Sequence, residues 1–441
     1  MARAQVNVQI TDDSFVIPFR GGDSQTVGGM VSVAHTEHHH GLLTVLGNTA
    51  ERANGYMTIE NVGDWMNRLS SREPTGVDGT TAGLYDSTEV PFRHATDDGT
   101  GHRAGDAFAG GNTYGRWPQG PTGGWKGDWW AVHNFLQYGG RCIVAGSESA
   151  LQDKSLNIDV VFVGASTGGA DYANNRYLPN PTQVTTAVNV ATTRKDCIAV
   201  VPNGGTAGDA GVLADVSGVG RVSGSQASEY VVEVFGQKYQ TNINRNANEN
   251  ETGLINIHCA PDVAGIMART DQVADPWISP AGARRGTLID AIKLAYNPTK
   301  GEQDTLYDGA VNPIINDPDN GIMLFGDKTT TVATSTLSRI NVSRLFIHLK
   351  KTIGAAARSK LFEINDADTR SSFKNAIEPF LTQIKSRDGI YDFRVVCDET
   401  NNTSNIIDSN QFVADVFVKP AKSINFIQIQ FTNKNTQDSL G

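Results

Sequence analysis

Two buried-type strands separated by one helix constrain the fold of this 441-residue chain most strongly. Ile158 to Val163 and Ile198 to Val201 are short apolar runs rich in β-branched residues, and Thr182 to Arg194 follows a helical pattern. Strands joined through a helix pair in parallel, because parallel neighbours need a long crossover and not a tight hairpin. Residues 155–202 therefore predict a βαβ unit within an outer α/β body.

A second periodic region, nearer the end of the chain, predicts a module of a different design. Residues 344–362 place their apolar side chains on one helical stripe, and Asp366 caps a second helix that Gly389 ends at its C-cap. Pro379 is expected to kink this second helix. Strands are predicted at 390–396, 412–418 and 424–431. Two helices over a small sheet make an α+β module, so the chain as a whole is predicted to be a multidomain α+β protein.

Both ends of the chain carry alternating strand patterns that have no local partner. An isolated strand is not stable, so we expect each of these segments to complete the sheet of a neighbouring subunit. The apolar positions of the two arms are Val6, Val8, Ile10, Ile427, Ile429 and Phe431. Between the arms, residues 74–127 are dominated by Gly, Thr, Asp and Pro and predict a long surface insertion.

The charge of the chain is unevenly distributed. The formal net charge of -10 argues against general nucleic-acid binding, which needs clustered Lys and Arg. The segment from Lys328 to Phe362 nevertheless has no Asp or Glu. Its basic residues are Lys328, Arg339, Arg344, Lys350, Lys351, Arg358 and Lys360. A solvated helix face is one interpretation, and a surface that meets an acidic partner is the other.

Few residues suggest a metal or a cofactor. Cys142, Cys197, Cys259 and Cys397 lie far apart and predict buried free thiols. The histidines at 38–40 predict an exposed turn, because adjacent side chains point in different directions and no metal-ligand spacing completes a site. No Walker or dinucleotide motif follows a strand, so we expect no cofactor and no metal. We also expect no signal peptide and no membrane insertion.

One motif suggests an enzyme. Gly164-Ala-Ser166-Thr-Gly168 follows a strand and matches G-x-S-x-G, the nucleophile elbow of α/β-hydrolases. A triad would combine Ser166 with Asp196 or Asp209 and with His258. The elbow needs a helix directly behind its serine, and the glycines and prolines that follow are poor helix formers. A serine hydrolase is therefore the distant alternative, and we expect no catalytic residues.

The last two fifths of the chain contain an ordered series of short motifs. They include Pro276-Trp277-Ile-Ser-Pro280, Val311-Asn312-Pro313, Arg339-Ile-Asn-Val-Ser-Arg344, Leu361-Phe362-Glu363-Ile-Asn365-Asp366 and Val418-Lys419-Pro420. This series resembles the C-terminal half of the contractile phage tail sheath family. The resemblance implies a structural subunit that polymerises helically around a tail tube and contracts to drive the tube through the host envelope.

The same resemblance implies partners and a location. The partners would be further copies of the chain, the tail tube protein, and the baseplate and tail terminator proteins, with no direct nucleic-acid contact. The location would be the virion tail, after synthesis in the host cytoplasm. R-type bacteriocins and phage-derived injection machines use the same family, so the sheath of such a machine is the near alternative.

The resemblance also implies a division of the chain. Its parts would be an exchanged arm at 1–20, an outer sheath body at 21–340, a tube-proximal domain at 341–424, and an exchanged strand and tail at 425–441. The first helix of the tube-proximal domain would lie against the tube. The tube-facing residues implied are Arg344, Lys350, Lys351, Arg358 and Lys360.

Overall fold

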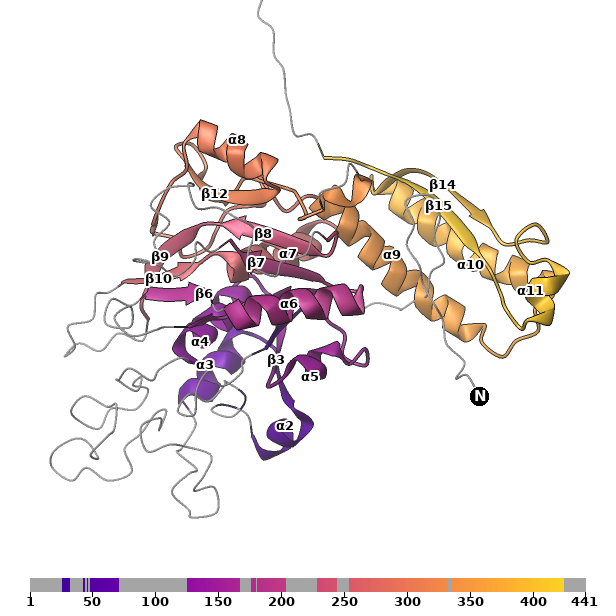
Figure 1. Ribbon diagram of the computed structural model, residues 1–441, viewed down its shortest axis with the longest axis horizontal. Coiled ribbons are helices and arrows are strands. Elements are labelled where there is room, and N and C mark those ends of the chain that lie inside the picture. The colour runs from indigo at the N-terminus through magenta and orange to yellow at the C-terminus, as the bar shows by residue number, and fades with distance from the viewer. Residues whose placement is uncertain are drawn as a thin grey trace, which may run out of the picture.

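The computed structural model of the chain describes residues 26–31, 43, 46, 48–70, 125–166, 176–179, 181–203, 228–243, 254–331 and 335–423. Residues up to 331 form a broad α/β body, and residues 335–423 form an elongated extension that leaves the body on one side (Figure 1). Each part buries a hydrophobic cluster. Helix α9 (Ile340–Ser359) joins the two parts, because Ile347 belongs to the body cluster and Leu345 to the extension cluster.

An eight-stranded sheet forms the centre of the body. Its order is β13-β12-β8-β7-β4-β1-β3-β2, in which the outermost strands β2 and β13 are antiparallel to their neighbours and all the other pairs are parallel. The strands are β1 (Val27–Val31), β2 (Tyr56–Ile59), β3 (Arg141–Ala145), β4 (Val160–Phe162), β7 (Ile198–Pro202), β8 (Val231–Phe235), β12 (Val311–Asp317) and β13 (Gly321–Leu324). Every residue of β1, β7 and β8 is buried, as expected for parallel strands covered on both faces.

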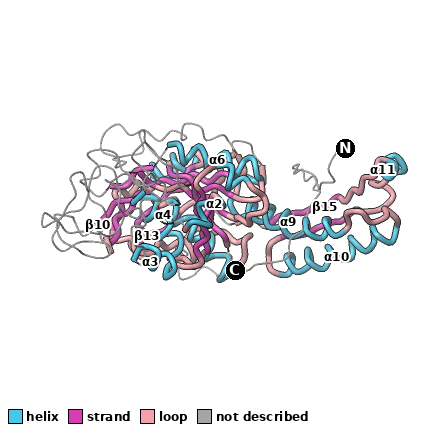
Figure 2. The backbone as a smooth tube through the Cα atoms, turned by 90° about the horizontal axis from the view of Figure 1, so that it is seen from below, coloured by secondary structure: helices cyan, strands magenta, loops and turns pink. Residues whose placement is uncertain are grey.

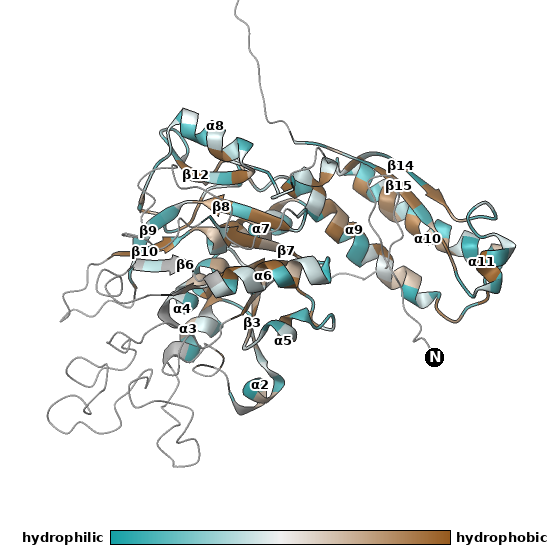
Figure 3. Cartoon of the chain, in the orientation of Figure 1, coloured by the Kyte–Doolittle hydropathy of each residue, from teal (hydrophilic) through white to brown (hydrophobic). Residues whose placement is uncertain are grey.

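Seven helices of the described body flank its sheets. They are α2 (Thr49–Asn54), α3 (Val62–Ser70), α4 (Trp125–Leu136), α5 (Glu148–Gln152), α6 (Pro181–Arg194), α7 (Ala260–Val273) and α8 (Lys300–Asp308). Figure 3 shows the contrast between the largely hydrophobic α7, which is buried, and the more hydrophilic α8. Helix α6 lies between β4 and β7 in the sequence, and Val160 pairs with Ile198 in parallel register, so the predicted βαβ geometry is present.

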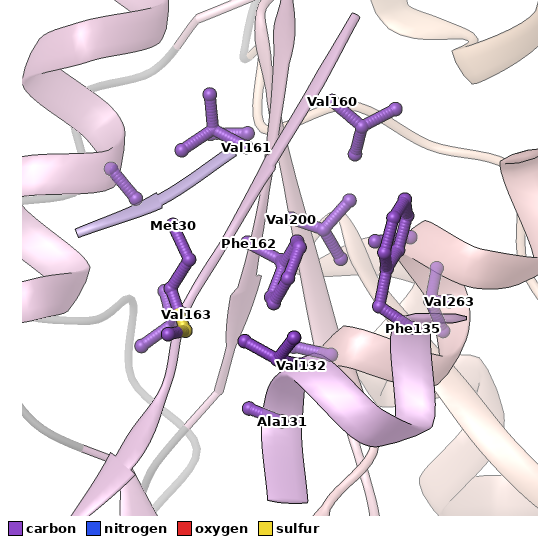
Figure 4. Close-up of a cluster of buried hydrophobic side chains, with 14 of the residues drawn as sticks. Met30, Ala131, Val132, Phe135, Val160, Val161, Phe162, Val163, Val200 and Val263 are labelled. Atoms are coloured by element: carbon purple, nitrogen blue, oxygen red, sulfur yellow. The ribbon is translucent and has the colours of Figure 1, made fainter. Parts of the chain in front are cut away.

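The packing of α4 on the central sheet shows why small residues occur in β1. The Phe135 and Phe162 rings stack with centroids 4.9 Å apart, and Met30 and Val132 lie near them (Figure 4). A Cβ atom at Gly28 would lie 2.5 Å from the Phe135 ring. The ring of Phe135 therefore occupies the space that a side chain at position 28 would need.

A second sheet of five strands covers part of the body, in the order β11-β9-β10-β6-β5. Its strands are β5 (Ala165–Ser166), β6 (Arg176–Pro179), β9 (Gln237–Thr241), β10 (Leu254–His258) and β11 (Lys293–Leu294). Lys238 and Asp262 form an ion pair of 2.8 Å with no exposed side-chain surface, and Lys238 also donates to the Ile289 carbonyl. This pair fixes α7 against β9, because a buried charge is tolerated only when it is paired.

The extension consists of two long helices and a two-stranded sheet. After the 3-10 turn η3 (Thr336–Ser338) come α9, α10 (Ala367–Ser386), β14 (Ile390–Val396), α11 (Ser404–Asp408) and β15 (Asp415–Pro420). Figure 2 shows α9, α10 and β15 extending side by side from the body, with α11 at the far tip. The buried residues between them include Leu345, Leu349, Phe373, Ile377 and Val416, as the helical periodicity predicts.

The end of α10 differs from the sequence prediction. Asp366 caps the helix as predicted, its side chain accepting from the Thr369 amide at 2.7 Å, and the helix continues through Pro379 to Ser386. Asp388, not Gly389, adopts the left-handed conformation, with φ at 59°. Gly389 is needed for a different reason: a Cβ there would lie 2.5 Å from Ile384 and 3.0 Å from the Trp277 ring.

Several predictions concern residues outside the described ranges. They are the arm at 1–20, the histidines at 38–40, residues 74–124 of the predicted insertion, and the strand at 424–431. Trp125 to Gly127, predicted as the end of the insertion, belong to α4. The four cysteines are confirmed as buried free thiols.

Candidate interaction surface

The acid-free segment from Lys328 to Phe362 supplies most of α9, and the structure shows where its cations lie. Arg344 donates from one guanidinium nitrogen to both carboxylate oxygens of Asp271 on α7, at 2.6 Å each. The Thr26 hydroxyl, just before β1, donates to the same carboxylate. The Arg344 side chain is only 5% exposed, and burial raises the pKa of Asp271 despite the guanidinium beside it. Arg344 is therefore part of the junction between α9 and the body.

Lys351 forms a second contact about two helical turns further along. Its ammonium pairs with Asp159, which lies directly before β4, and donates to the Ile158 carbonyl at 2.5 Å. Burial acts to raise the pKa of Asp159, but Lys351 and the Val27 amide together outweigh it, so that this pKa lies below its ordinary value. The ammonium therefore holds α9 at the start of two neighbouring strands, β1 and β4.

Lys350 also points to the body. It donates to the Lys195 carbonyl, just before β7, at 2.5 Å, and lies 5.7 Å from the centroid of the Tyr230 ring. Burial lowers the pKa of Lys350 to about 8. The end of α10 is attached nearby, because Arg387 pairs with Asp275 at 2.8 Å and its carbonyl accepts from the Trp277 indole at 3.1 Å.

These contacts correct part of the sequence prediction. Arg344, Lys350 and Lys351 were predicted to present charge to an outside partner, but in the folded subunit they meet acidic and carbonyl oxygens of the body. Asp159 and the Lys195 carbonyl lie just before β4 and β7, and Asp271 on α7 contacts Thr26, just before β1. The segment lacks acids because its counter-charges, Asp159 and Asp271, come from distant parts of the sequence.

Arg358 and Lys360, by contrast, lie at the far end of α9. The Arg358 side chain is exposed, and no ion pair with it occurs among the described residues. Lys360 approaches the Ser372 hydroxyl at 3.2 Å. The turn that follows exposes two large apolar side chains, Phe362 at 92% and Ile364 at 77%. Of the five predicted tube-facing residues, these two cations remain at the surface, next to an exposed apolar turn.

The two-stranded sheet offers a place for further strands. Within the described residues β14 pairs only with β15, in antiparallel register, so that each strand has one edge without a ladder partner. An open edge is a template for another strand. The arm residues Val6, Val8, Ile10, Ile427, Ile429 and Phe431 lie outside the described ranges.

The geometry around Ser166 does not fit a hydrolase. Ser166 lies in β5 and pairs antiparallel with Leu178, whereas an elbow serine lies at the turn from a parallel strand into a helix. His258 Nε2 is 2.9 Å from the Gly164 carbonyl, and burial lowers the pKa of His258 to about 4. Its Nδ1, which a triad carboxylate would accept from, has no hydrogen-bond partner within the described part of the chain.

The carboxylates that a triad would need are also otherwise placed. Asp196 is held by Arg194 at 2.8 Å, and Asp209 lies outside the described ranges. Among the described side chains, no group of three or more His, Cys, Asp or Glu is arranged to hold a metal ion. None of the helices that the structure describes is long and apolar enough to cross a membrane.

Sequence reasoning missed the partners of α9. The absence of acids in a basic helix indicates that counter-charges come from elsewhere, but Asp159 and Asp271 stand out from none of the other acidic residues in the sequence. It also missed a cleft beside Trp277. Both features depend on tertiary packing between distant segments.

Two family models match the chain: the phage tail sheath protein central domain over residues 176–330, and the phage tail sheath C-terminal domain over residues 332–434. The two matches together cover more than half of the chain.

Curated relatives match a shorter region. The chain is 51% identical over 177 residues to the tail sheath protein of Vibrio phage KVP40, a match that covers 40% of this chain and 26% of the relative. It is 48% identical over 172 residues to the tail sheath protein of Enterobacteria phage T4, covering 39% and 26% respectively. The chain thus matches about a quarter of the length of these curated relatives.

A solved assembly extends the likeness of fold to the whole chain. The fold is similar to a chain in the cryo-EM structure of an extracellular contractile injection system, the PVC sheath complex in its contracted state. The TM-score is 0.60 over 99% of both chains, at 15% sequence identity. At this identity the likeness concerns the fold alone.

Proposed function

We propose that this chain, which belongs to the phage tail sheath family, is the structural subunit of a contractile tail sheath. Copies of it would polymerise helically around a tail tube, contract once, and drive the tube through the host envelope to deliver the genome. The observation that carries this proposal is the match of two consecutive sheath domains over residues 176–330 and 332–434. The partners would be the chain itself, the tube protein, and the baseplate and terminator proteins, all within the virion tail.

A second candidate is the sheath of a phage-derived injection machine or an R-type bacteriocin. The fold similarity to the contracted sheath of an extracellular injection system favours it. The same kind of sheath subunit would serve in both candidates, which differ in what the particle carries. The identity of about half with two phage sheath proteins favours the phage over the machine.

The proposed sheath subunit is not an enzyme. The energy of contraction would be held in the extended polymer, as a metastable state separated from the contracted one by a kinetic barrier. No cofactor or nucleotide is needed for such a transition. The position of Ser166 in a paired strand supports this proposal against a hydrolase.

Subunits would be linked through their ends. The segments 1–20 and 425–441 would leave the subunit as arms and pair with the open edges of the β14–β15 sheet of neighbouring subunits. Several ladder hydrogen bonds at a net ~0.5 to 1.5 kcal/mol each would hold subunits together while permitting rotation. Residues 21–340 would form the outer body, and residues 341–424 the tube-proximal domain.

The tube would meet the far end of α9 and not its middle. Arg358 and Lys360 are exposed or partly exposed there, whereas Arg344 and Lys351 are used within the subunit. Exposed ion pairs are worth roughly 0 to 1 kcal/mol each, so a few of them guide assembly and are released together on contraction.

Negative-stain imaging of the purified chain tests the proposal. Long striated tubes or ring fragments are expected from a sheath subunit. Discrete monomers with an esterase activity that Ser166→Ala abolishes would instead support the hydrolase.

A further inference from the structure

A cleft of about 580 Å³ lies where the extension leaves the body, and part of its lining is apolar. The apolar side chains come from Trp277, Ile278, Ala281, Pro313 and Phe325. Phe325 is 49% exposed, although it follows the buried strand β13. A volume of this size lies within the roughly 300–1,000 Å³ of typical ligand pockets, so it can take more than one large side chain.

The chain itself leads to this cleft. After β15, residues Ala421, Lys422 and Ser423 form part of the cleft wall, and the described residues end at Ser423. The Ala421 amide donates to the Gly389 carbonyl at 3.1 Å, and the Asn341 side chain donates to the Ala421 carbonyl at 3.3 Å. The backbone is therefore held on both sides of Ala421.

The last described residue is also held. The Ser423 hydroxyl donates to Asp327 Oδ2 at 2.7 Å, and the Asp327 side chain is almost completely buried in the cleft wall. Burial raises the pKa of Asp327, while the hydroxyls of Ser423 and Ser279 act in the opposite direction. Residue 424 thus starts from a fixed point beside the apolar lining.

We propose that this cleft binds the chain's own residues Ile424 to Phe426, so that the part of the C-terminal arm free to exchange begins at Ile427 and not at residue 425. Ile424 and Phe426 alternate with Asn425 and are apolar, which matches the lining. Three extended residues span at most roughly 10 Å, at about 3.3 Å each, so residue 426 is within reach of the cleft from Ser423. Binding in the cleft transfers a force on the C-terminal arm to the body, because the force then acts on Trp277 and Phe325 and not on the β14–β15 sheet.

The competing occupant is the same segment from a second copy of the chain. A cysteine pair distinguishes the two in the full-length protein. Phe325→Cys is combined with Phe426→Cys, and the protein is oxidised briefly with a copper catalyst and run on a non-reducing gel. The four native cysteines are buried, so they give little background. The matched control combines Phe325→Cys with Thr436→Cys, ten residues further along the tail.

Binding of residues 424–426 in the cleft predicts a bridge within one chain, seen as a shifted monomer band, that forms roughly tenfold or more faster for 325–426 than for 325–436. Two results would overturn it: covalent dimers as the main 325–426 product, or equal rates for the two pairs. Thermal unfolding of the single Phe325→Cys variant checks that the fold is intact.

The transfer of force from the arm to the body rests on the proposed sheath function. The disulfide between positions 325 and 426 does not depend on that function. Imaging of the same preparation reports polymer formation separately. Tubes in the images without the 325–426 disulfide on the gel would contradict the binding of residues 424–426 in the cleft and support the sheath function. The disulfide without tubes would support that binding and contradict the sheath function.

Discussion

The guanidinium of Arg344 on α9 donates to both carboxylate oxygens of Asp271 on α7, at 2.6 Å. This contact joins the extension to the body, and the pair of Lys351 with Asp159 adds to it. Both acids also accept from the start of β1, Asp271 from the Thr26 hydroxyl and Asp159 from the Val27 amide. The basic face of α9 therefore docks on its own subunit, at the end of the central sheet where β1 and β4 begin.

The first prediction concerns this ion pair. Arg344→Met leaves Asp271 buried and without its cation, so the free energy of unfolding is expected to fall by about 3–5 kcal/mol. The double variant Arg344→Met with Asp271→Leu should recover much of that loss, since no uncompensated charge remains. Urea denaturation measures both. Arg358→Met is the matched control and should change stability by less than ~0.5 kcal/mol. Equal effects of the Arg344 and Arg358 changes would contradict the docking role.

The second prediction separates tube binding from folding. Arg358→Glu combined with Lys360→Glu should leave the subunit folded, because both side chains are at the surface, yet prevent it from sedimenting with tubes of its own particle. Binding of the unchanged chain should weaken as salt is raised. Lys350→Glu with Lys351→Glu is a poor substitute: it would place carboxylates against Asp159 and two backbone carbonyls and lower stability itself. If the 358/360 variant binds tubes normally at low salt, the tube contact lies elsewhere.

The third prediction concerns pH. His258 is buried, and desolvation lowers its pKa from 6.5 to about 4, so the folded state keeps it neutral. A depressed pKa contributes stability that is fully present above pH 6.5 and is lost as the pH falls towards 4. At 1.36 kcal/mol per unit the loss approaches ~3 kcal/mol. The His258→Gln variant should show a shallower decline between pH 6.5 and 4 in denaturant titrations. Parallel pH profiles for the two proteins would contradict this assignment.

The fourth prediction concerns two glycines. Gly28→Ala would bring a Cβ to 2.5 Å from the Phe135 ring, so we expect a loss of about 1–3 kcal/mol through overpacking. Gly301→Ala on α8 meets no atom within 4 Å and should stabilise the protein by ~0.5–1 kcal/mol through helix propensity. Thermal unfolding compares the two, and a loss at Gly301 equal to that at Gly28 would refute the packing argument.

Sequence patterns predicted the elements that depend on local periodicity. The strands around Val160 and Ile198, the cap at Asp366 and the strand Ile390–Val396 are all present, because apolar spacing and capping act over a few residues. The pattern could not distinguish the roles of Asp388 and Gly389, since a close approach by Ile384 and Trp277 is a tertiary property.

The candidate surface was predictable only in part. The sequence identified α9 as basic. It could not show which cations pair within the subunit, because their partners Asp159 and Asp271 lie far away in the chain. The same holds for Ser166. Its G-x-S-x-G motif matches a nucleophile elbow, but the antiparallel pairing of Ser166 with Leu178 depends on β6, a later strand of the chain. Periodicity specifies which residues share a face, and not what that face meets.

We propose above that the chain polymerises through its terminal arms. Negative-stain imaging of the full chain beside the chain lacking residues 1–20 tests it most directly, with circular dichroism to check that both are folded. We expect striated tubes from the full chain and folded single subunits from the truncated one. Normal tubes from the truncated chain, or only monomers from the full chain, would contradict it.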